Sequence, residues 1–176
     1  MTSQNETDAQ EHLQGWFAGR LPDGWFVGAP EVTADREELL VIGTLAEPEL
    51  QQDATAEARG SALQARIQGF REDTRQQRMR IADEAQRRFG RKVSWGAVCG
   101  DQRQLFTTLS VPAMTRLRMP ERRVLDTLVD AGVARSRSHA LAWCVRLVAE
   151  RQDDWLKDLR EALKQVEQVR GEGPKD

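Results

Sequence analysis

The stretch that decides the fold is residues 113–150, AMTRLRMPERRVLDTLVDAGVARSRSHALAWCVRLVAE. Pro120 suits the first turn of a helix, where its missing N–H costs no hydrogen bond, and Glu121 adds favourable charge at the positive end of that helix. Apolar residues then form a one-sided stripe up to Gly132, which ends the helix. Ser136 is a good N-cap for a second helix. The stretch therefore predicts two helices joined by a short turn.

This stretch resembles the ribbon-helix-helix family of dimeric DNA-binding proteins. The matching pieces are Leu117-Arg118-Met119-Pro120, Leu125-Asp126-Thr127-Leu128, Ala131-Gly132-Val133 and Ser136-Arg137-Ser138-His139-Ala140-Leu141. Two departures stand against the match. His139 occupies a position where that family commonly has Glu, and about 110 residues precede a ribbon that the family usually places near the start of a short module.

The resemblance implies a dimer and a mode of DNA binding. In that family, strands from two chains pair antiparallel and enter the major groove, where alternate side chains of the ribbon face the bases. By this alternation Met119, Leu117 and Thr115 would face the core. The residues implied to face bases are Met114, Arg116 and Arg118, the two arginines donating to guanine. The residues implied to hold phosphate, at the start of the second helix, are Arg135, Ser136, Arg137 and Ser138.

Two other interpretations of this stretch stay open. Residues 114–119 also fit a helical face if Pro120 kinks the helix, in which case the preceding strand ends at Pro112 and no ribbon is free to pair. The two helices are also compatible with a simple packed scaffold on which Arg116 and Arg118 are ordinary solvated residues.

Upstream of this stretch, the chain alternates hairpins with a helix. Residues 25–33 and 39–45 are apolar and predict two strands, with a hairpin connection at residues 34–37. A second pair of strands is expected at residues 93–98 and 105–111, around turn residues 100–102.

A long helix is expected between these two hairpins. It would run from Asp53, a possible N-cap, to Gly90 in the C′ position, with Gly60 and Gly69 as weak points where it could break. Its polar face is rich in arginine, and Thr74 and Arg78 fill a gap in its apolar stripe. The predicted fold class is α+β: two β-hairpins flanking a long helix (ββαββ), followed by a ribbon-helix-helix-like helical C-terminal part.

The chain divides into five predicted segments. They are a disordered N-terminus at 1–14, an α+β domain at 15–112, the ribbon-helix-helix-like module at 113–150, an amphipathic C-terminal helix at 151–170 and a frayed tail at 171–176. The apolar stripe of the C-terminal helix packs on the protein's own sheet, seals a dimer or docks a partner, and we favour self-association.

Charge is distributed unevenly along the chain. The formal net charge is −2, but residues 1–58 carry −10, residues 59–146 carry +10 and residues 147–176 carry −2. Such asymmetry is typical of proteins with a polyanionic partner. It is equally compatible with an acidic segment that packs on a basic one within a single fold.

Several functional classes have no support in the sequence. No apolar run approaches the roughly 20 residues of a membrane span, and the N-terminus lacks the basic start and apolar stretch of a secretory signal. Two scattered cysteines fit a reduced, cytoplasmic setting and form no zinc motif with the two histidines. No glycine-rich phosphate loop is present, so we expect no cofactor. No acid, base and nucleophile converge, so we do not expect an enzyme.

The sequence therefore predicts a cytoplasmic DNA-binding protein, a dimeric transcription regulator or a nucleoid-associated factor. The expected partners are double-stranded DNA and a second copy of the chain. The alternative is a non-catalytic adaptor protein, or an RNA- or ribosome-associated factor acting through the arginine-rich helix at 59–91. The chain also resembles uncharacterised proteins of high-GC actinobacteria, which adds no function.

Overall fold

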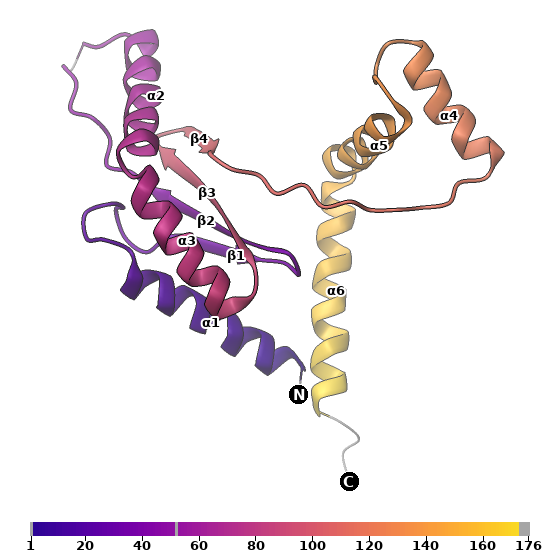
Figure 1. Ribbon diagram of the computed structural model, residues 1–176, viewed down its shortest axis with the longest axis horizontal. Coiled ribbons are helices and arrows are strands. Elements are labelled where there is room, and N and C mark those ends of the chain that lie inside the picture. The colour runs from indigo at the N-terminus through magenta and orange to yellow at the C-terminus, as the bar shows by residue number, and fades with distance from the viewer. Residues whose placement is uncertain (1, 52, 173–176) are drawn as a thin grey trace. The chain divides into compact units, whose positions relative to one another are not determined.

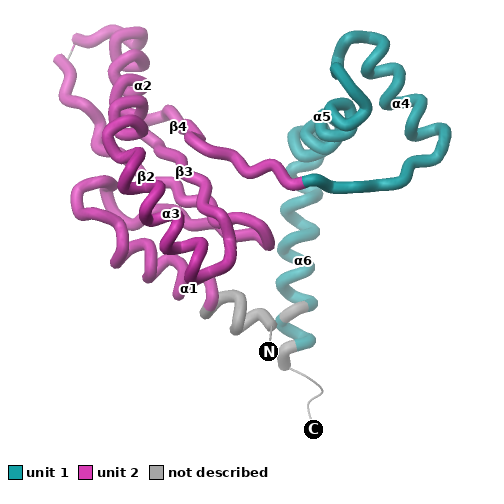
Figure 2. Tube along the Cα trace, viewed as in Figure 1, with its two compact units in different colours: residues 1–4, 112–176 teal, residues 5–111 magenta. Residues whose placement is uncertain are grey.

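The computed structural model describes residues 2–51 and 53–172, and it divides into two compact units (Figures 1 and 2). The N-terminal unit comprises residues 5–111, and the C-terminal unit comprises residues 1–4 and 112–176. The elements are α1 (Thr2–Arg20), β1 (Glu31–Ala34), β2 (Glu38–Thr44), α2 (Ala56–Asp73), α3 (Arg75–Phe89), β3 (Lys92–Cys99), β4 (Gln102–Leu105), α4 (Met119–Asp130), α5 (Arg137–Arg151) and α6 (Asp153–Glu172).

The N-terminal unit is built on a four-stranded sheet of order β1-β2-β3-β4. The pairs β1–β2 and β3–β4 are antiparallel hairpins, and the central pair β2–β3 is parallel, with α2 and α3 forming the crossover between them. The α+β class is thus confirmed. The predicted ββαββ order is wrong in detail, because α1 precedes the first hairpin and two helices replace the single long one.

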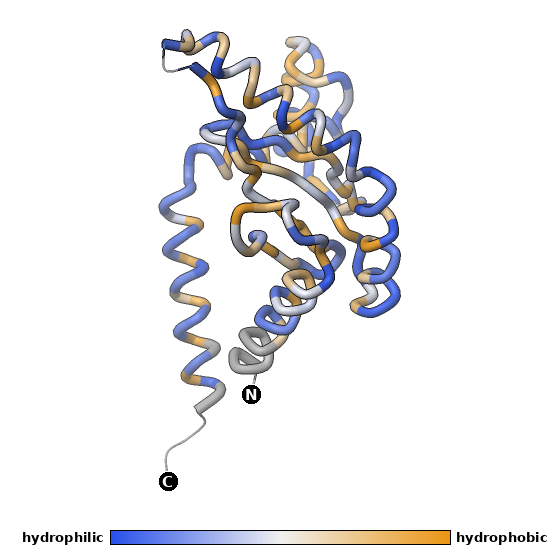
Figure 3. The backbone as a smooth tube through the Cα atoms, turned by 90° about the vertical axis from the view of Figure 1, so that its left-hand side faces the viewer, coloured by the Kyte–Doolittle hydropathy of each residue, from blue (hydrophilic) through white to orange (hydrophobic). Residues whose placement is uncertain are grey.

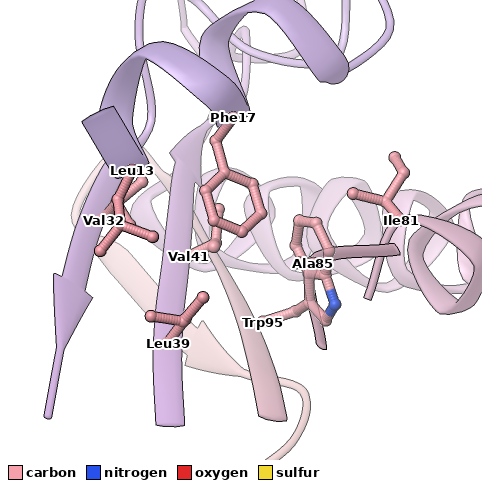
Figure 4. Close-up of a cluster of buried hydrophobic side chains, with 8 residues drawn as sticks. All are labelled: Leu13, Phe17, Val32, Leu39, Val41, Ile81, Ala85 and Trp95. Carbon is pink, nitrogen blue, oxygen red and sulfur yellow. The ribbon is translucent and has the colours of Figure 1, made fainter. Parts of the chain in front are cut away.

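The core of this unit lies on one face of the sheet. Alternate residues of a strand share a face, and the buried Leu39 and Val41 of β2 lie on the same side as Trp95 of β3. These side chains pack against α1 and α3 in a cluster that also contains Leu13, Phe17, Val32, Ile81 and Ala85 (Figure 4). A second cluster joins α2 to the same strands through Leu45, Leu63, Ile67, Ala97 and Cys99.

Helix α1 corrects the expectation of disorder at residues 1–14. Its polar composition conceals two buried anchors, Leu13 and Phe17, which enter the core cluster. Arg20 adds an ion pair to Glu84 of α3, with nitrogen–oxygen distances of 2.5 and 2.7 Å. Tertiary contacts thus compensate for a weakly amphipathic sequence.

The predicted beginning of the first strand is wrong. The expected strand at 25–33 is shortened to β1 because Gly28 has a φ of 85°, and Pro30 has no N–H to donate to a ladder. Trp25 and Phe26 instead pack edge-on and tilted against Phe70 of α2. The hairpin connection that follows is confirmed, and Asp35 Oδ1 accepts the amides of Glu37 and Glu38 at 2.8 and 2.7 Å.

The expected helix at 53–90 is interrupted at Thr74, not at Gly60 or Gly69. Its N-cap is Thr55 instead of Asp53, and the Thr55 hydroxyl accepts the amide of Ala58 at 3.2 Å. At the interruption the Thr74 hydroxyl donates to the Phe70 carbonyl at 2.6 Å. The predicted end at Gly90 is confirmed, since Gly90 has a left-handed φ of 70°.

The last strand of the sheet is also displaced from its predicted position. Cys99 pairs with Gln102 across a two-residue turn, so β4 ends at Leu105 and does not occupy 105–111. Residues 107–118 are neither helix nor strand, apart from the hydrogen bonds of Thr107 to Trp95. This corrects both interpretations of 114–118, as a strand and as a helix, for the single chain.

The C-terminal unit confirms the two central helices. Pro120 lies in the first turn of α4, Gly132 follows its end with a φ of 73°, and Ser136 caps α5 by accepting the amide of His139 at 3.2 Å. The helices meet around a small buried cluster of Leu125, Ala134 and Ala140. After a break at Gln152, α6 begins as a separate helix.

Candidate nucleic-acid interface and arginine-lined pocket

The segment before α4 carries the predicted base-facing residues. Met114 is 99% exposed, and Arg116 and Arg118 are exposed as well. Between the two arginines, Leu117 turns inward and packs against the α4–α5 cluster. The predicted alternation therefore holds at 116–118. It fails at Thr115 and Met119, which are exposed where the prediction places them in the core.

The end of this segment is fixed at the start of α4. Arg118 occupies the N-cap position with extended dihedral angles, φ −80° and ψ 173°. Arg122, on the first turn of α4, donates through Nη1 to the Leu117 carbonyl at 2.8 Å. Arg122 and its neighbour Arg123 are exposed and add two positive charges beside Arg116 and Arg118, which the sequence analysis did not include in the site.

The predicted phosphate site lies at the start of α5. Arg135, Ser136, Arg137 and Ser138 are exposed there, with the helix N-terminus beside them. The Ser136 hydroxyl is occupied by its capping bond, and the Arg135 amide donates to His139 Nδ1 at 3.3 Å. The amides of a first helical turn carry partial positive charge, which suits an anion.

One of these four residues, Arg137, forms an ion pair within the chain. Arg137 donates to both carboxylate oxygens of Asp126 on α4, at 2.6 and 2.8 Å. The hydrogen bond and the positive charge of Arg137 lower the pKa of Asp126, so the carboxylate is held in its charged form. This ion pair links α4 to α5 and offsets the charge that Arg137 would offer to a phosphate.

The N-terminal unit contains a second feature, which the sequence analysis missed. A pocket of ≈ 610 Å³ lies between the α2–α3 junction and the end of the β3–β4 hairpin. Its charged lining residues are Arg71, Arg75, Arg78 and the acidic Glu72, and its apolar walls include Trp95 and Phe106.

Arg78 is the unusual residue of this pocket. It is only 6% exposed, and its donors reach neutral oxygens: Nε to the Thr74 hydroxyl at 2.9 Å and Nη2 to the Arg71 carbonyl at 2.6 Å. Its guanidinium lies over the Phe106 ring, 4.9 Å from the centroid. Within residues 2–51 and 53–172, no carboxylate forms an ion pair with it.

The surroundings of Arg78 disfavour its charge. Burial, together with the positive charges of Arg71 and Arg75, lowers the pKa of Arg78 to about 10. A buried cation without a countercharge is costly, and an anion in the pocket would relieve that cost. The available sequence signal was an arginine within an apolar helical stripe, and its meaning depends on Phe106, which directly follows β4.

The parts of the chain that the structure describes contain no group of three or more His, Cys, Asp or Glu side chains arranged to hold a metal ion. None of the described helices has the length and apolar character needed to cross a membrane.

Comparison with known proteins shows that the chain is similar to proteins of mycobacteria. A family described as "Rv1265-like protein, N-terminal domain" matches residues 11–105, and one described as "Mb1296 C-terminal domain" matches residues 118–170. The uncharacterised proteins Mb1296 of Mycobacterium bovis and Rv1265 of Mycobacterium tuberculosis are each 58% identical to the chain over 159 residues, which is 90% of this chain and 69% of theirs. No solved structure matches. Neither family is described as ribbon-helix-helix, so that resemblance stays a prediction.

Proposed function

The chain belongs to the family of Rv1265-like proteins, and we propose that this member binds double-stranded DNA as a homodimer through its C-terminal unit. The observation that carries the proposal is the largely exposed segment at 112–118, which is neither helix nor strand and presents Arg116 and Arg118 directly before a pair of helices. Two such segments, one from each copy, could pair antiparallel and form a ribbon of the width that the major groove admits.

The thin core of the C-terminal unit supports a dimer. Among its described residues, the buried apolar side chains are Leu125, Ala134 and Ala140. Three such side chains bury little surface against the conformational entropy of about 60 residues. A second copy would supply the missing burial, and it could also pair with the backbone amides and carbonyls of 113–116.

Arginine chemistry supports DNA as the partner. Arg116 and Arg118 could donate in bidentate fashion to guanine N7 and O6, while Arg122, Arg123 and Arg135 are placed to neutralise phosphates. The N-terminus of α5 would add an anchor for one phosphate. In this function the protein acts as a regulator or nucleoid-associated factor and needs no catalytic group.

The test is selection of genomic duplex fragments by the full-length protein, followed by affinity measurements on an enriched site. Arg118→Ala should lose roughly ten- to a hundredfold in affinity for that site, the cost of one bidentate base contact. Arg36→Ala is the matched control, because Arg36 is an exposed arginine of the N-terminal unit. Unchanged affinity in Arg118→Ala would refute the base-reading role. Absence of any duplex binding would favour the adaptor or RNA-associated alternatives.

A second candidate function belongs to the N-terminal unit, namely the binding of a small anion as an effector. The observation in its favour is the buried, unpaired Arg78, flanked by Arg71 and Arg75 in an open pocket with aromatic walls. A ligand that carries a phosphate, sulfate or carboxylate group on an apolar ring would match both the charge and the walls.

Calorimetric titration with inorganic phosphate, sulfate and benzoate tests this second candidate. Binding by the wild type should be lost in Arg78→Met and retained in Arg80→Ala, because Arg80 lies on the same helix but does not line the pocket. Equal binding in both variants would refute a role for the pocket.

A further inference from the structure

The arginine-lined pocket of the N-terminal unit has two chemically different ends. Along its helical side, Arg71, Arg75, Arg78, Met79 and Ala82 recur at steps of three and four residues, so they lie on one side of α2 and α3. The first three of these residues are basic and the last two are apolar. The pocket is therefore basic where α2 meets α3 and apolar farther along α3.

The apolar end is accessible from solvent. Met79 is 57% exposed and Ala82 is half-buried, although α3 is otherwise rich in arginine. Figure 3 shows how hydrophilic and hydrophobic positions alternate along the helices. Val93 continues the apolar surface on the sheet side, since β3 begins at Lys92, directly after α3 ends at Phe89. A ligand at this end would therefore contact hydrocarbon from both a helix and a strand.

The basic end keeps a net positive charge. Its three arginines are accompanied by Glu72, which lines the pocket and accepts a hydrogen bond from Gln68. Three positive charges and one negative charge leave +2. The hydrogen bonds of Arg78 to Thr74 and Arg71 use two of the five N–H groups of its guanidinium, so donors remain for a carboxylate.

The pocket is larger than a compact anion requires. Its volume of ≈ 610 Å³ falls within the range of about 300–1,000 Å³ that is typical of sites for drug-sized ligands. A phosphate or sulfate ion at the arginines would leave the apolar end in water. A hydrocarbon body at that end would remove apolar surface from water and so stabilise the complex.

We propose that this pocket binds an amphipathic carboxylate. The three arginines bind its head group, and its hydrocarbon body lies along Met79, Ala82 and Val93. The inference rests on the second candidate function above, because it names the class of ligand for the same site. It is independent of DNA binding by the C-terminal unit.

The test is calorimetric titration of the full-length protein with butanoate, hexanoate and octanoate. Each methylene that leaves water should tighten binding about three- to fourfold, which amounts to roughly a hundredfold between butanoate and octanoate. Octanol, which has the hydrocarbon body without the charge, should bind at least about tenfold more weakly than octanoate.

The apolar end is tested separately by Ala82→Asp. Octanoate should then bind no more tightly than butanoate, because the new carboxylate disfavours a hydrocarbon body beside it. Gln86→Asp adds the same charge at an exposed position of α3 that does not line the pocket, and it should keep the dependence on chain length. Met79→Gln repeats the test at a largely exposed position where folding is not at risk, and it should weaken octanoate binding several-fold without affecting butanoate.

The outcomes separate this inference from the candidate function on which it rests. Equal affinities for butanoate and octanoate, both lost in Arg78→Met, would overturn the amphipathic ligand and leave the anion site standing. Octanoate binding that persists in Arg78→Met would overturn the assignment of the head group. If neither the carboxylates nor inorganic phosphate bind to the wild type, both the anion site and the amphipathic ligand are refuted.

Discussion

At the residue scale, the buried and unpaired charge of Arg78 is better explained by ligand binding than by folding. Its guanidinium is buried against Phe106, with Thr74 and the Arg71 carbonyl as its hydrogen-bond partners. A charge that served the fold alone would be expected to have a carboxylate partner at this depth. Keeping it unpaired beside Arg71 and Arg75 is intelligible if the pocket receives an anion.

Arg78→Met is therefore expected to unfold at the same urea concentration as the wild type, or at a higher one, at neutral pH. The folded state holds the Arg78 proton less tightly than the unfolded state, because the pKa of Arg78 is lowered to about 10 when folded. The wild type must then gain stability relative to Arg78→Met as the pH rises through about 10. Urea unfolding at several pH values checks this.

A marked loss of stability in Arg78→Met at neutral pH would show that the Arg78 side chain stabilises the folded state. The difference in the free energy of unfolding between Arg78→Met and the wild type should change as the pH rises through about 10. A constant difference would contradict the proposal that burial destabilises the charge of Arg78. Phosphate added to the wild type should shift its unfolding to higher urea and leave Arg78→Met unaffected, since a ligand stabilises only the state that binds it.

Asp126 gives a second prediction at this scale. Asp126→Asn removes the carboxylate that neutralises Arg137 and frees the guanidinium at the start of α5. If this helix end holds a phosphate, the variant should bind duplex DNA more tightly, with a steeper salt dependence by about one unit per chain. Fluorescence anisotropy across a salt series measures both. Weaker binding would indicate that the Asp126–Arg137 pair is needed to position the interface.

At the element scale, close packing between β2 and the loop that precedes β1 can be tested at Gly43. A Cβ added at Gly43 would lie 2.1 Å from the Phe26 ring, so either the ring or the strand must shift. Gly43→Ala should lower the free energy of unfolding by about 1–3 kcal/mol. Gly69→Ala is the control: a Cβ at Gly69 on α2 meets nothing within 4 Å, and this variant should be more stable by about 0.5–1 kcal/mol. Destabilisation of equal size in both would contradict the packing argument.

The elements that sequence could predict are those with local signals. Pro120, Ser136 and Gly90 set helix ends through their own backbone and capping chemistry, and each was placed correctly. The burial of Arg78 could not be predicted, because it depends on Phe106 packing from another part of the chain. The break at Thr74 has no local signal of the kind that Gly or Pro gives, since Thr74 lies within an otherwise continuous helical pattern. Sequence left residues 2–14 between disorder and a loose helix for the same reason, since Leu13 and Phe17 become anchors only against the sheet.

The candidate site was predictable to a smaller extent. Arg116 and Arg118 are exposed as predicted, although the alternation that predicted it fails at Thr115 and Met119. The ion pair between Arg137 and Asp126 could not be predicted, because it requires the turn between α4 and α5. The strand expected at 114–119 is absent from the single chain. In our proposal this strand forms only when a second chain supplies a partner strand. The hydrophobic pattern of one chain does not show that a second chain is required.

At the scale of the whole molecule, the charge asymmetry of the sequence does not separate the two units. Residues 5–111 contain the acidic stretch together with most of the basic one and carry a net charge of −4, whereas residues 112–176 carry +2. Binding of DNA by the C-terminal unit therefore depends on the local grouping of its arginines and not on a large net charge. The account predicts DNA binding by a protein whose overall composition is acidic.

The measurement that tests this claim most directly is the affinity of the full-length protein for duplex DNA across a series of salt concentrations. We predict binding at low salt and a linear fall of the logarithm of the affinity with the logarithm of salt concentration. The slope should correspond to several phosphate contacts per dimer and should become shallower in the Arg122→Ala/Arg123→Ala variant. No binding at low salt, or an affinity independent of salt, would contradict the account.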